Sequence, residues 1–300
     1  THYLSLSAAS LWQARTGIPA RGFPSSEALL HPDLVFPPNK TVLLVAISRS
    51  GETTETVEAT RQFLNTRSGR VICITCDSQS SLADLAGLLL ATDQAQENSV
   101  VQTQSFTSML IMAQALAGLF AETDISVLDT LPSKAESLFQ YESLSKEIGS
   151  DLTWNHFVFL GGGSRYGIAS EAMLKMKEMT LSNTEAYHPL EYRHGPMSLI
   201  TENTLILGLI SEEARAQEIA VLEDMQDLGA RILALADKPG IDLEPFEYQV
   251  TLQSDSPHWT HPPLYLPIPQ LIAYYRAIAK NLNPDQPTNL TAVIQLDSVG

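Results

Sequence analysis

The sequence predicts an α/β protein with two doubly wound halves, each a parallel sheet flanked by helices in three layers. Three observations support this fold class. The apolar segments are short and lack sustained polar alternation, as in parallel strands that are buried on both faces. They alternate with helical patterns, which is the order of βα units. A turn of small residues follows an apolar segment once in each half.

In the first half, residues 42–47 and 71–75 have the length and apolar character of buried strands. Residues 4–13, 52–64 and 100–121 show the spacing of apolar side chains that is typical of helices. These segments alternate in the order that a parallel sheet with crossover helices requires.

The second half repeats this alternation after a polar helical connector at residues 135–148. Its predicted strands are residues 157–160, 205–210 and 232–236. Its predicted helices are residues 166–181, 212–227 and 269–281. We therefore expect a first domain over residues 1–130, a connecting helix within 131–150 and a second domain over 151–300.

Composition narrows the classes of function. The formal net charge of −16 argues against a nucleic-acid partner. No apolar run reaches the roughly 18 residues that a membrane-spanning helix needs, so we expect no membrane segment. Cys73 and Cys76 lie in and beside a predicted strand, where core packing is favoured over a metal or redox pair. Two cysteines in 300 residues fit a reducing cytoplasm.

The turn Ser48-Arg49-Ser50-Gly51-Glu52-Thr53 joins the first predicted strand to a helix. Free N–H groups at a helix start, the positive end of the helix dipole and short hydroxyl side chains together form a cradle for a dianion. We therefore predict a phosphate site, with a phosphorylated small molecule as its ligand. The alternative is a simple N-cap, in which Ser50 accepts the N–H of Thr53.

A second candidate cluster is Glu171, Lys175 and Glu178, which share one stripe of a helix at i, i+4 and i+7. This helix follows the glycine turn at 161–163, at the sheet edge where ligands of parallel sheets collect. Apolar residues flank the narrow charged stripe, so a half-buried carboxylate there suits general-base chemistry. The alternative is a solvated ladder of salt bridges.

Residues 185–196 carry two histidines, two acids and an arginine, and we expect a polar loop that delivers His194 as an acid or base. A metal site at His188, Glu191 and His194 is disfavoured, because this spacing spreads the side chains around a helix. The glycines of 161–167 lack the G-x-G-x-x-G spacing, so a nicotinamide cofactor is not expected.

Four motifs, in order along nearly the whole chain, resemble the SIS (sugar isomerase) family. Residues 47–53 resemble its phosphosugar loop, and residues 97–107 resemble the substrate-contact loop and helix start of its double-domain members. Residues 171–178 and 185–196 resemble the isomerase half of glucosamine-6-phosphate synthase. The segment 283–290 resembles the tail of the same enzymes.

This resemblance implies two SIS domains, each with a five-stranded parallel sheet of flavodoxin-like type, in a homodimer whose active site lies between subunits. Thr1 would end a further phosphate loop, and the strand and helix before it would be missing from this chain. The implied phosphate contacts are Ser48, Ser50 and Thr53, with Arg49 in the same turn. The implied sugar contacts are Val100, Gln102 and Thr103.

The resemblance also implies the catalytic groups. Glu178 would be the base that moves a proton between C1 and C2, with Lys175 beside it and Glu171 in the same group. His194, donated by the neighbouring subunit, would open the sugar ring. Neither a metal nor another cofactor is implied, because the net reaction moves only protons.

Three differences from the synthases shift the expectation towards stand-alone members of the family. The chain shows no recognisable glutaminase segment. Ala292 stands where the synthases have a tail lysine that can form an imine, and Gln102 replaces a smaller hydroxyl residue. The expected function is isomerisation or deamination of a hexose 6-phosphate derivative by a cytoplasmic enzyme. The alternative is a non-catalytic sugar-phosphate sensor.

Overall fold

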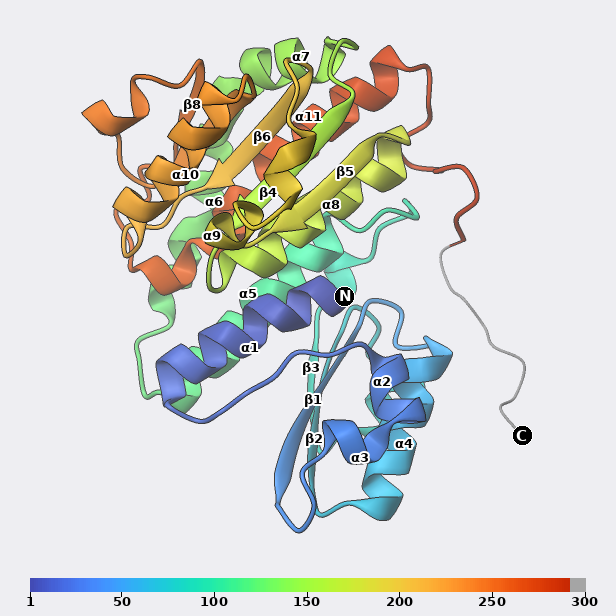
Figure 1. The fold of residues 1–300 in the computed structure, drawn as a ribbon. Coiled ribbons are helices and arrows are strands. Elements are labelled where there is room, and N and C mark those ends of the chain that lie inside the picture. The colour runs from blue at the N-terminus through green and yellow to red at the C-terminus, as the bar shows by residue number, and fades with distance from the viewer. Residues whose placement is uncertain (292–300) are drawn as a thin grey trace. The chain divides into compact units, whose positions relative to one another are not determined.

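A computed structural model of the chain describes residues 1–291 and divides them into two compact units. Unit 1 comprises Thr1–Ala121 with the segment that begins at Asn289, and unit 2 comprises Glu122–Thr288. Every strand pairing in both units is parallel, which confirms the predicted fold class (Figure 1). Ala292, the position of the synthase tail lysine, lies outside the described residues.

Unit 1 has a three-stranded sheet of order β1-β2-β3 within the described residues. Three helices, α2 to α4, lie beside one face of this sheet, and α1 packs along α5 (Figure 1). Its elements are α1 (His2–Thr16), α2 (Ser25–Leu30), α3 (Pro32–Val35), β1 (Val42–Ser48), α4 (Thr54–Thr66), β2 (Gly69–Thr75), β3 (Leu88–Ala91) and α5 (Gln104–Phe120).

Alternate side chains of the unit 1 strands enter a core under α2 and α4. Leu44 and Ala46 of β1 pack there with Phe63 of α4 and Cys73 of β2. Burial raises the pKa of Cys73 to about 12, as expected for a thiol that packs in a core rather than reacting. Cys76 is buried as well, just past the end of β2. The core fixes the carboxyl end of β1, from which the predicted phosphate turn at residues 48–53 emerges.

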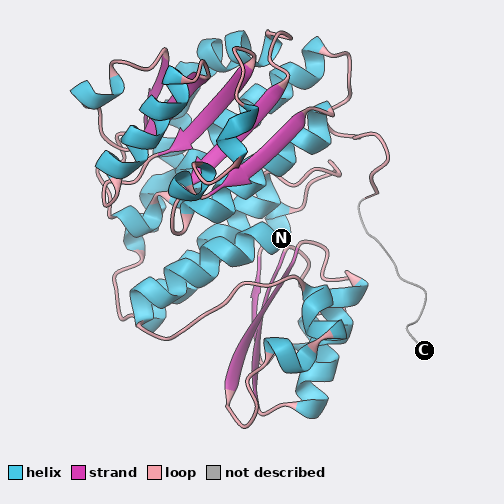
Figure 2. Cartoon of the chain, in the orientation of Figure 1, coloured by secondary structure: helices cyan, strands magenta, loops and turns pink. Residues whose placement is uncertain are grey.

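Unit 2 has a five-stranded sheet of order β5-β4-β6-β7-β8 in residues 122–288, with helices on both faces (Figure 2). Its strands are β4 (His156–Gly161), β5 (Asn183–Tyr187), β6 (Thr204–Leu209), β7 (Arg231–Ala236) and β8 (Tyr248–Thr251). Its helices are α6 (Leu131–Ser137), α7 (Glu142–Ser150), α8 (Arg165–Thr180), α9 (Pro189–Tyr192), α10 (Arg215–Asp227) and α11 (Pro267–Ala279). The order reverses between β4 and β6, so α8 begins at the switch point of the sheet.

The strands and the connector depart from the sequence expectations as follows. The strands β3, β5 and β8 were not predicted. The predicted helix at 135–148 is instead α6 and α7 with a short 3-10 segment between them. The resemblance implied five strands in each half, whereas unit 1 has three among the described residues. Within residues 1–291, no helix is both long and apolar enough to cross a bilayer.

Candidate functional site

The turn after β1 brings three hydroxyl side chains to the start of α4. Ser48 Oγ accepts the N–H of Gly51 at 3.1 Å and lies 3.2 Å from Thr53 Oγ1. Ser50 Oγ accepts the N–H of Glu52 at 3.2 Å, so the expected alternative, a cap on the N–H of Thr53, is not formed. Thr53 is the N-cap residue of α4, and its side chain makes no cap hydrogen bond in the described chain.

Glycine is required at the centre of this turn. Gly51 has a φ of +64°, and a Cβ there would lie 1.9 Å from Ser80 Oγ. The next side chain, Glu52, is directed to Ser81, whose N–H and hydroxyl donate to its carboxylate at 2.7 and 2.8 Å. The turn therefore presents hydroxyls and a helix N-terminus, which is the chemistry of a phosphate site.

Arg49 has a different environment from its neighbours in the turn. The residue is 6 % exposed, and its Nη1 donates to the carbonyls of Ser99 and Val100 at 3.0 and 3.3 Å. Its own carbonyl accepts the N–H of Cys76 at 3.0 Å, so its backbone is fixed to the end of β2. The structure thus connects the phosphate turn to the predicted sugar-contact loop through this side chain.

The loop that precedes α5 is organised by Glu97. Its carboxylate accepts the N–H and the hydroxyl of Thr103, at 3.1 and 3.0 Å, and the N–H of Ser105 at 3.1 Å. The hydroxyl of Ser105 donates to it as well. A side-chain carboxylate therefore occupies the α5 N-terminus, a role that sequence reasoning missed. Its only sequence signal is an acid a few residues ahead of a helix.

The three predicted sugar contacts differ in what they offer a ligand. The carbonyl of Val100 accepts a hydrogen bond from Arg49, and the hydroxyl of Thr103 donates one to Glu97. Gln102 Oε1 is buried and has no hydrogen-bond partner among residues 1–291. Of the three predicted sugar contacts, Gln102 is therefore the one with a buried side-chain oxygen that accepts no hydrogen bond from the described residues. Thr1, the other predicted contact in unit 1, precedes α1, and its carbonyl accepts the N–H of Ser5 at 3.1 Å.

In unit 2, the predicted stripe on α8 is an ion cluster. Lys175 Nζ lies 2.7 Å from Glu178 Oε2 and 3.2 Å from Glu171 Oε1. The side chains of Lys175 and Glu171 are 3 % and 2 % exposed, whereas that of Glu178 is 21 % exposed. The alternative of a solvated ladder is wrong for the two buried members. Of the two glutamates in this cluster, Glu178 is the one that contacts the lysine and is also accessible to solvent.

Two opposing effects set the charge of Lys175. Burial lowers its pKa, but attraction by Glu171 and Glu178 outweighs this effect and raises the pKa above its ordinary value. The lysine is therefore a cation at neutral pH and can stabilise negative charge that develops nearby. Packing of α8 against β4, β5 and α11 encloses this cation.

Residues 185–196 are not one polar loop, as expected, because β5 runs to Tyr187 and α9 follows it. His194 lies in the turn after α9; it is exposed, and its backbone N–H donates to the carbonyl of Glu191 at 3.0 Å. His188 stacks on Tyr166, with ring centroids 4.0 Å apart. Both histidines are exposed, and they differ in that His188 stacks on an aromatic ring whereas His194 lies in the turn after α9. Among the described residues, no three potential metal ligands converge.

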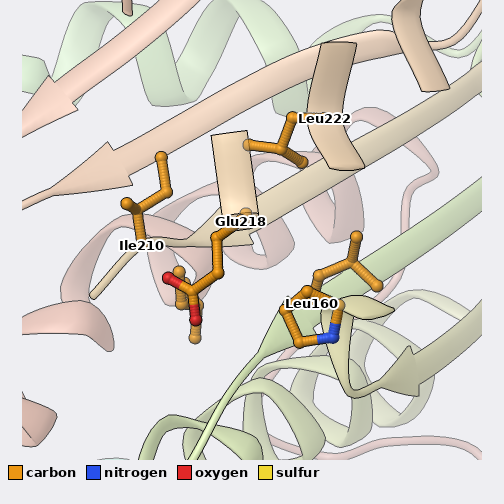
Figure 3. A pocket seen from close by; sticks show the side chains of 7 residues that line it. Leu160, Ile210, Glu218 and Leu222 are labelled. Carbon is orange, nitrogen blue, oxygen red and sulfur yellow. The ribbon is translucent and has the colours of Figure 1, made fainter. Parts of the chain in front are cut away.

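Unit 2 also contains a small cavity between β4, β6 and α10, beside Glu218 (Figure 3). Its volume of about 10 Å³ suits one water molecule and is far too small for a sugar. Glu218 Oε2 accepts the N–H of Ser211 at 2.6 Å, and burial raises the pKa of this carboxyl.

A larger hollow of about 410 Å³ includes Trp154, Asn203 and Arg231, at the amino ends of the strands. Ligands of parallel sheets bind at the opposite edge.

Comparison with known proteins identifies the family of the chain. The model of the SIS domain matches residues 15–119 and 152–280. The isomerizing glutamine–fructose-6-phosphate aminotransferase of Caldanaerobacter subterraneus subsp. tengcongensis is 29 % identical over 272 residues, which are 86 % of this chain and 45 % of that protein. The same enzyme of Clostridium perfringens is 30 % identical over 275 residues, covering 85 % and 44 %. The chain thus spans less than half the length of these relatives.

Two solved structures share the fold over almost all of the chain. The glucosamine-6-phosphate deaminase of Thermotoga maritima has a TM-score of 0.81 and 27 % identity, over 98 % of this chain and 88 % of that one. The tagatose-6-phosphate ketose/aldose isomerase of Escherichia coli has a TM-score of 0.85 and 21 % identity, covering 96 % and 82 %, which supports the fold alone. Since the domain model matches most of both halves, the chain belongs to the SIS domain family.

Proposed function

We propose that the chain is a phosphosugar isomerase or aminosugar-phosphate deaminase that acts on a hexose 6-phosphate derivative. The observation that carries this proposal is the Glu171–Lys175–Glu178 cluster on α8. Removing a lysine and its carboxylate partners from water costs desolvation free energy, so such a cluster contributes little to the stability of a helix. Groups of this kind concentrate at functional sites. The similar proteins include an isomerizing glutamine–fructose-6-phosphate aminotransferase and a glucosamine-6-phosphate deaminase, which supports the same class of substrate.

Unit 1 has the role of binding the substrate's phosphate. Ser48, Ser50 and Thr53 donate their hydroxyls, and the N-terminus of α4 adds the positive end of its dipole. Thr1 supplies a further contact in this proposal. Val100, Gln102 and Thr103 define the loop that recognises the sugar. Binding energy from the phosphate, which is remote from the reacting carbons, then lowers the barrier at C1 and C2.

Unit 2 has the role of moving the proton. Glu178 removes the proton from one of the carbons C1 and C2. The electron pair left behind forms the C1=C2 bond, and the former carbonyl oxygen takes up a proton, which gives an enediol or enolamine. The same carboxyl returns its proton to the neighbouring carbon while the hydroxyl or amine of the first carbon loses a proton and becomes a carbonyl or imine; water then hydrolyses the imine to release ammonia. No redox partner is needed. Lys175 stabilises the negative charge on the substrate oxygen during this transfer. Glu171 fixes Lys175 in place.

His194 assists ring opening in this proposal, and it is provided by a second copy of the chain in a homodimer. Its exposure in the turn after α9 supports a role at a subunit contact. Mixing Glu178→Gln and His194→Gln subunits tests this arrangement. If each site takes one residue from each chain, the mixture regains activity that neither variant has alone. Unchanged inactivity of a proven mixed dimer would contradict it. We also propose a cytoplasmic location, which the unbonded pair Cys73 and Cys76 fits.

Proton NMR in D2O with hexose and aminohexose 6-phosphates tests the function directly. We expect deuterium to enter C1 or C2 of the true substrate with the unaltered chain. Glu178→Gln should abolish this exchange while substrate binding remains, and Glu223→Gln, an exposed acid on α10, should leave it unchanged. Binding without any exchange in the unaltered chain would instead indicate a sugar-phosphate sensor.

A further inference from the structure

The side chain of Arg49 leaves the turn at 48–53 and reaches the loop that precedes α5. Its guanidinium is buried and donates to two carbonyls, those of Ser99 and Val100. Among residues 1–291, no carboxylate lies within ion-pair distance of it. A buried cation that has only carbonyl dipoles as partners is incompletely compensated. An anion bound in the turn at 48–53 would stabilise the buried guanidinium of Arg49.

The loop that Arg49 contacts is held at its other end by Glu97. The Glu97 carboxylate binds the first turn of α5 through Thr103, and Ser99 Oγ accepts the N–H of Val101 at 3.1 Å. Charged groups therefore fix both ends of residues 98–103, which we call the recognition loop. The hydrogen bonds from Arg49 connect this loop to the turn at 48–53.

We propose that Arg49 is a positioning residue that couples phosphate in the turn at 48–53 to the order of the recognition loop. This inference rests on the proposed function and specifies its substrate recognition. A bound phosphate supplies the counter-charge that the guanidinium lacks, which strengthens its buried position and hence its hold on the loop. Sugar recognition then depends on the phosphate, so sugars without a 6-phosphate are rejected even when their hydroxyls fit.

Hydrogen exchange of the amides in residues 98–105 tests the coupling, with inorganic phosphate as the probe. In the unaltered chain, we expect phosphate to slow this exchange. Arg49→Gln and Arg49→Lys should speed it at least about tenfold without ligand, because hydrogen bonds to a charged group are lost. Both should also lose the slowing by phosphate. Arg61→Gln, at an exposed arginine of α4, is the matched control and should behave as the unaltered chain.

Arg49→Lys separates positioning from charge, because it keeps the cation but loses the forked donor geometry. If this variant shows the same loop exchange and the same response to phosphate as the unaltered chain, the proposal is overturned. It is also overturned if phosphate binds the unaltered chain, by calorimetry, and the loop does not respond. Failure of phosphate to bind at all would instead overturn the phosphate site of the proposed function. Thermal midpoints of all variants identify any that are simply misfolded.

Discussion

Replacing Lys175 with methionine gives the sharpest test of the ion cluster, because two glutamates depend on this one cation. The Lys175–Glu171 pair is almost fully buried, and removing one partner of a buried pair costs about 3–5 kcal/mol of folding free energy. Glu178 is more exposed and becomes hydrated when the lysine is removed. The loss of the Lys175–Glu178 pair therefore adds on the order of 0.2–1 kcal/mol. The loss is a large part of the roughly 5–15 kcal/mol that stabilises a typical domain.

Chemical denaturation measures this loss of stability, and repeating it over a range of pH shows the direction in which the loss changes with pH. Since the pKa of Lys175 is raised above its ordinary 10.5, the stabilisation is fully present below 10.5 and disappears as pH rises through the folded-state pKa. The difference between the unaltered chain and Lys175→Met should therefore stay constant through neutral pH and shrink only in strong alkali.

A double variant and a control complete the experiment. Adding Glu171→Gln to Lys175→Met removes the unpaired buried charge and should recover at least about half of the lost stability. Lys177→Met, at an exposed lysine of the same helix, should change stability by no more than about 0.5 kcal/mol. A loss below about 1 kcal/mol for Lys175→Met, with no recovery in the double variant, would refute the reasoning.

Three further predictions concern other parts of the molecule. Gly51→Ala should abolish phosphate binding and cost about 3 kcal/mol or more, because its Cβ would clash with Ser80, whereas Gly163→Ala, at a φ of +55° in open space, should cost only about 1–2 kcal/mol. Equal costs in denaturation would contradict the steric argument. Glu97→Gln should destabilise the start of α5 by about 1–2 kcal/mol, raise KM for the phosphosugar and, because phosphate binding is coupled to the order of this loop, also weaken the binding of inorganic phosphate; an unchanged KM would exclude this role of the loop. Glu218→Gln should stabilise the protein at neutral pH, because burial raises the pKa of this carboxyl and its ionisation costs stability as pH rises; a gain that persists unchanged in acid would contradict that cause.

Five strands could be predicted from the sequence, namely the central strands and the edge strand β1, whereas three other edge strands could not. β1, β2, β4, β6 and β7 are apolar runs, and each prediction was correct to within one or two residues at its ends. Central strands of a parallel sheet are buried on both faces, which leaves this composition. The missed strands β3, β5 and β8 all lie at sheet edges. β5 and β8 mix polar and apolar side chains and carry no such signal, whereas β3 is apolar but only four residues long.

The candidate site divides in the same way. Helical spacing placed Glu171, Lys175 and Glu178 on one stripe, and the structure shows them in contact. Their burial depends on how α8 packs against other elements, which spacing alone does not specify. The contact of Arg49 with Ser99 joins residues fifty positions apart, and no local pattern predicts such a bond. Whether the remaining site residues act as the resemblance implies stays a prediction.

The Glu97 carboxylate has a consequence for which sugar phosphates the chain accepts. Unit 1 has two long helices whose N-termini follow loops of the candidate site, α4 and α5, and each is a potential anion site. Glu97 already fills the one at α5 and brings negative charge there. A sugar with phosphates at both ends would meet a hydroxyl-lined turn with one group and a carboxylate with the other. We therefore expect charge repulsion, rather than size, to favour monophosphates over bisphosphates in this chain.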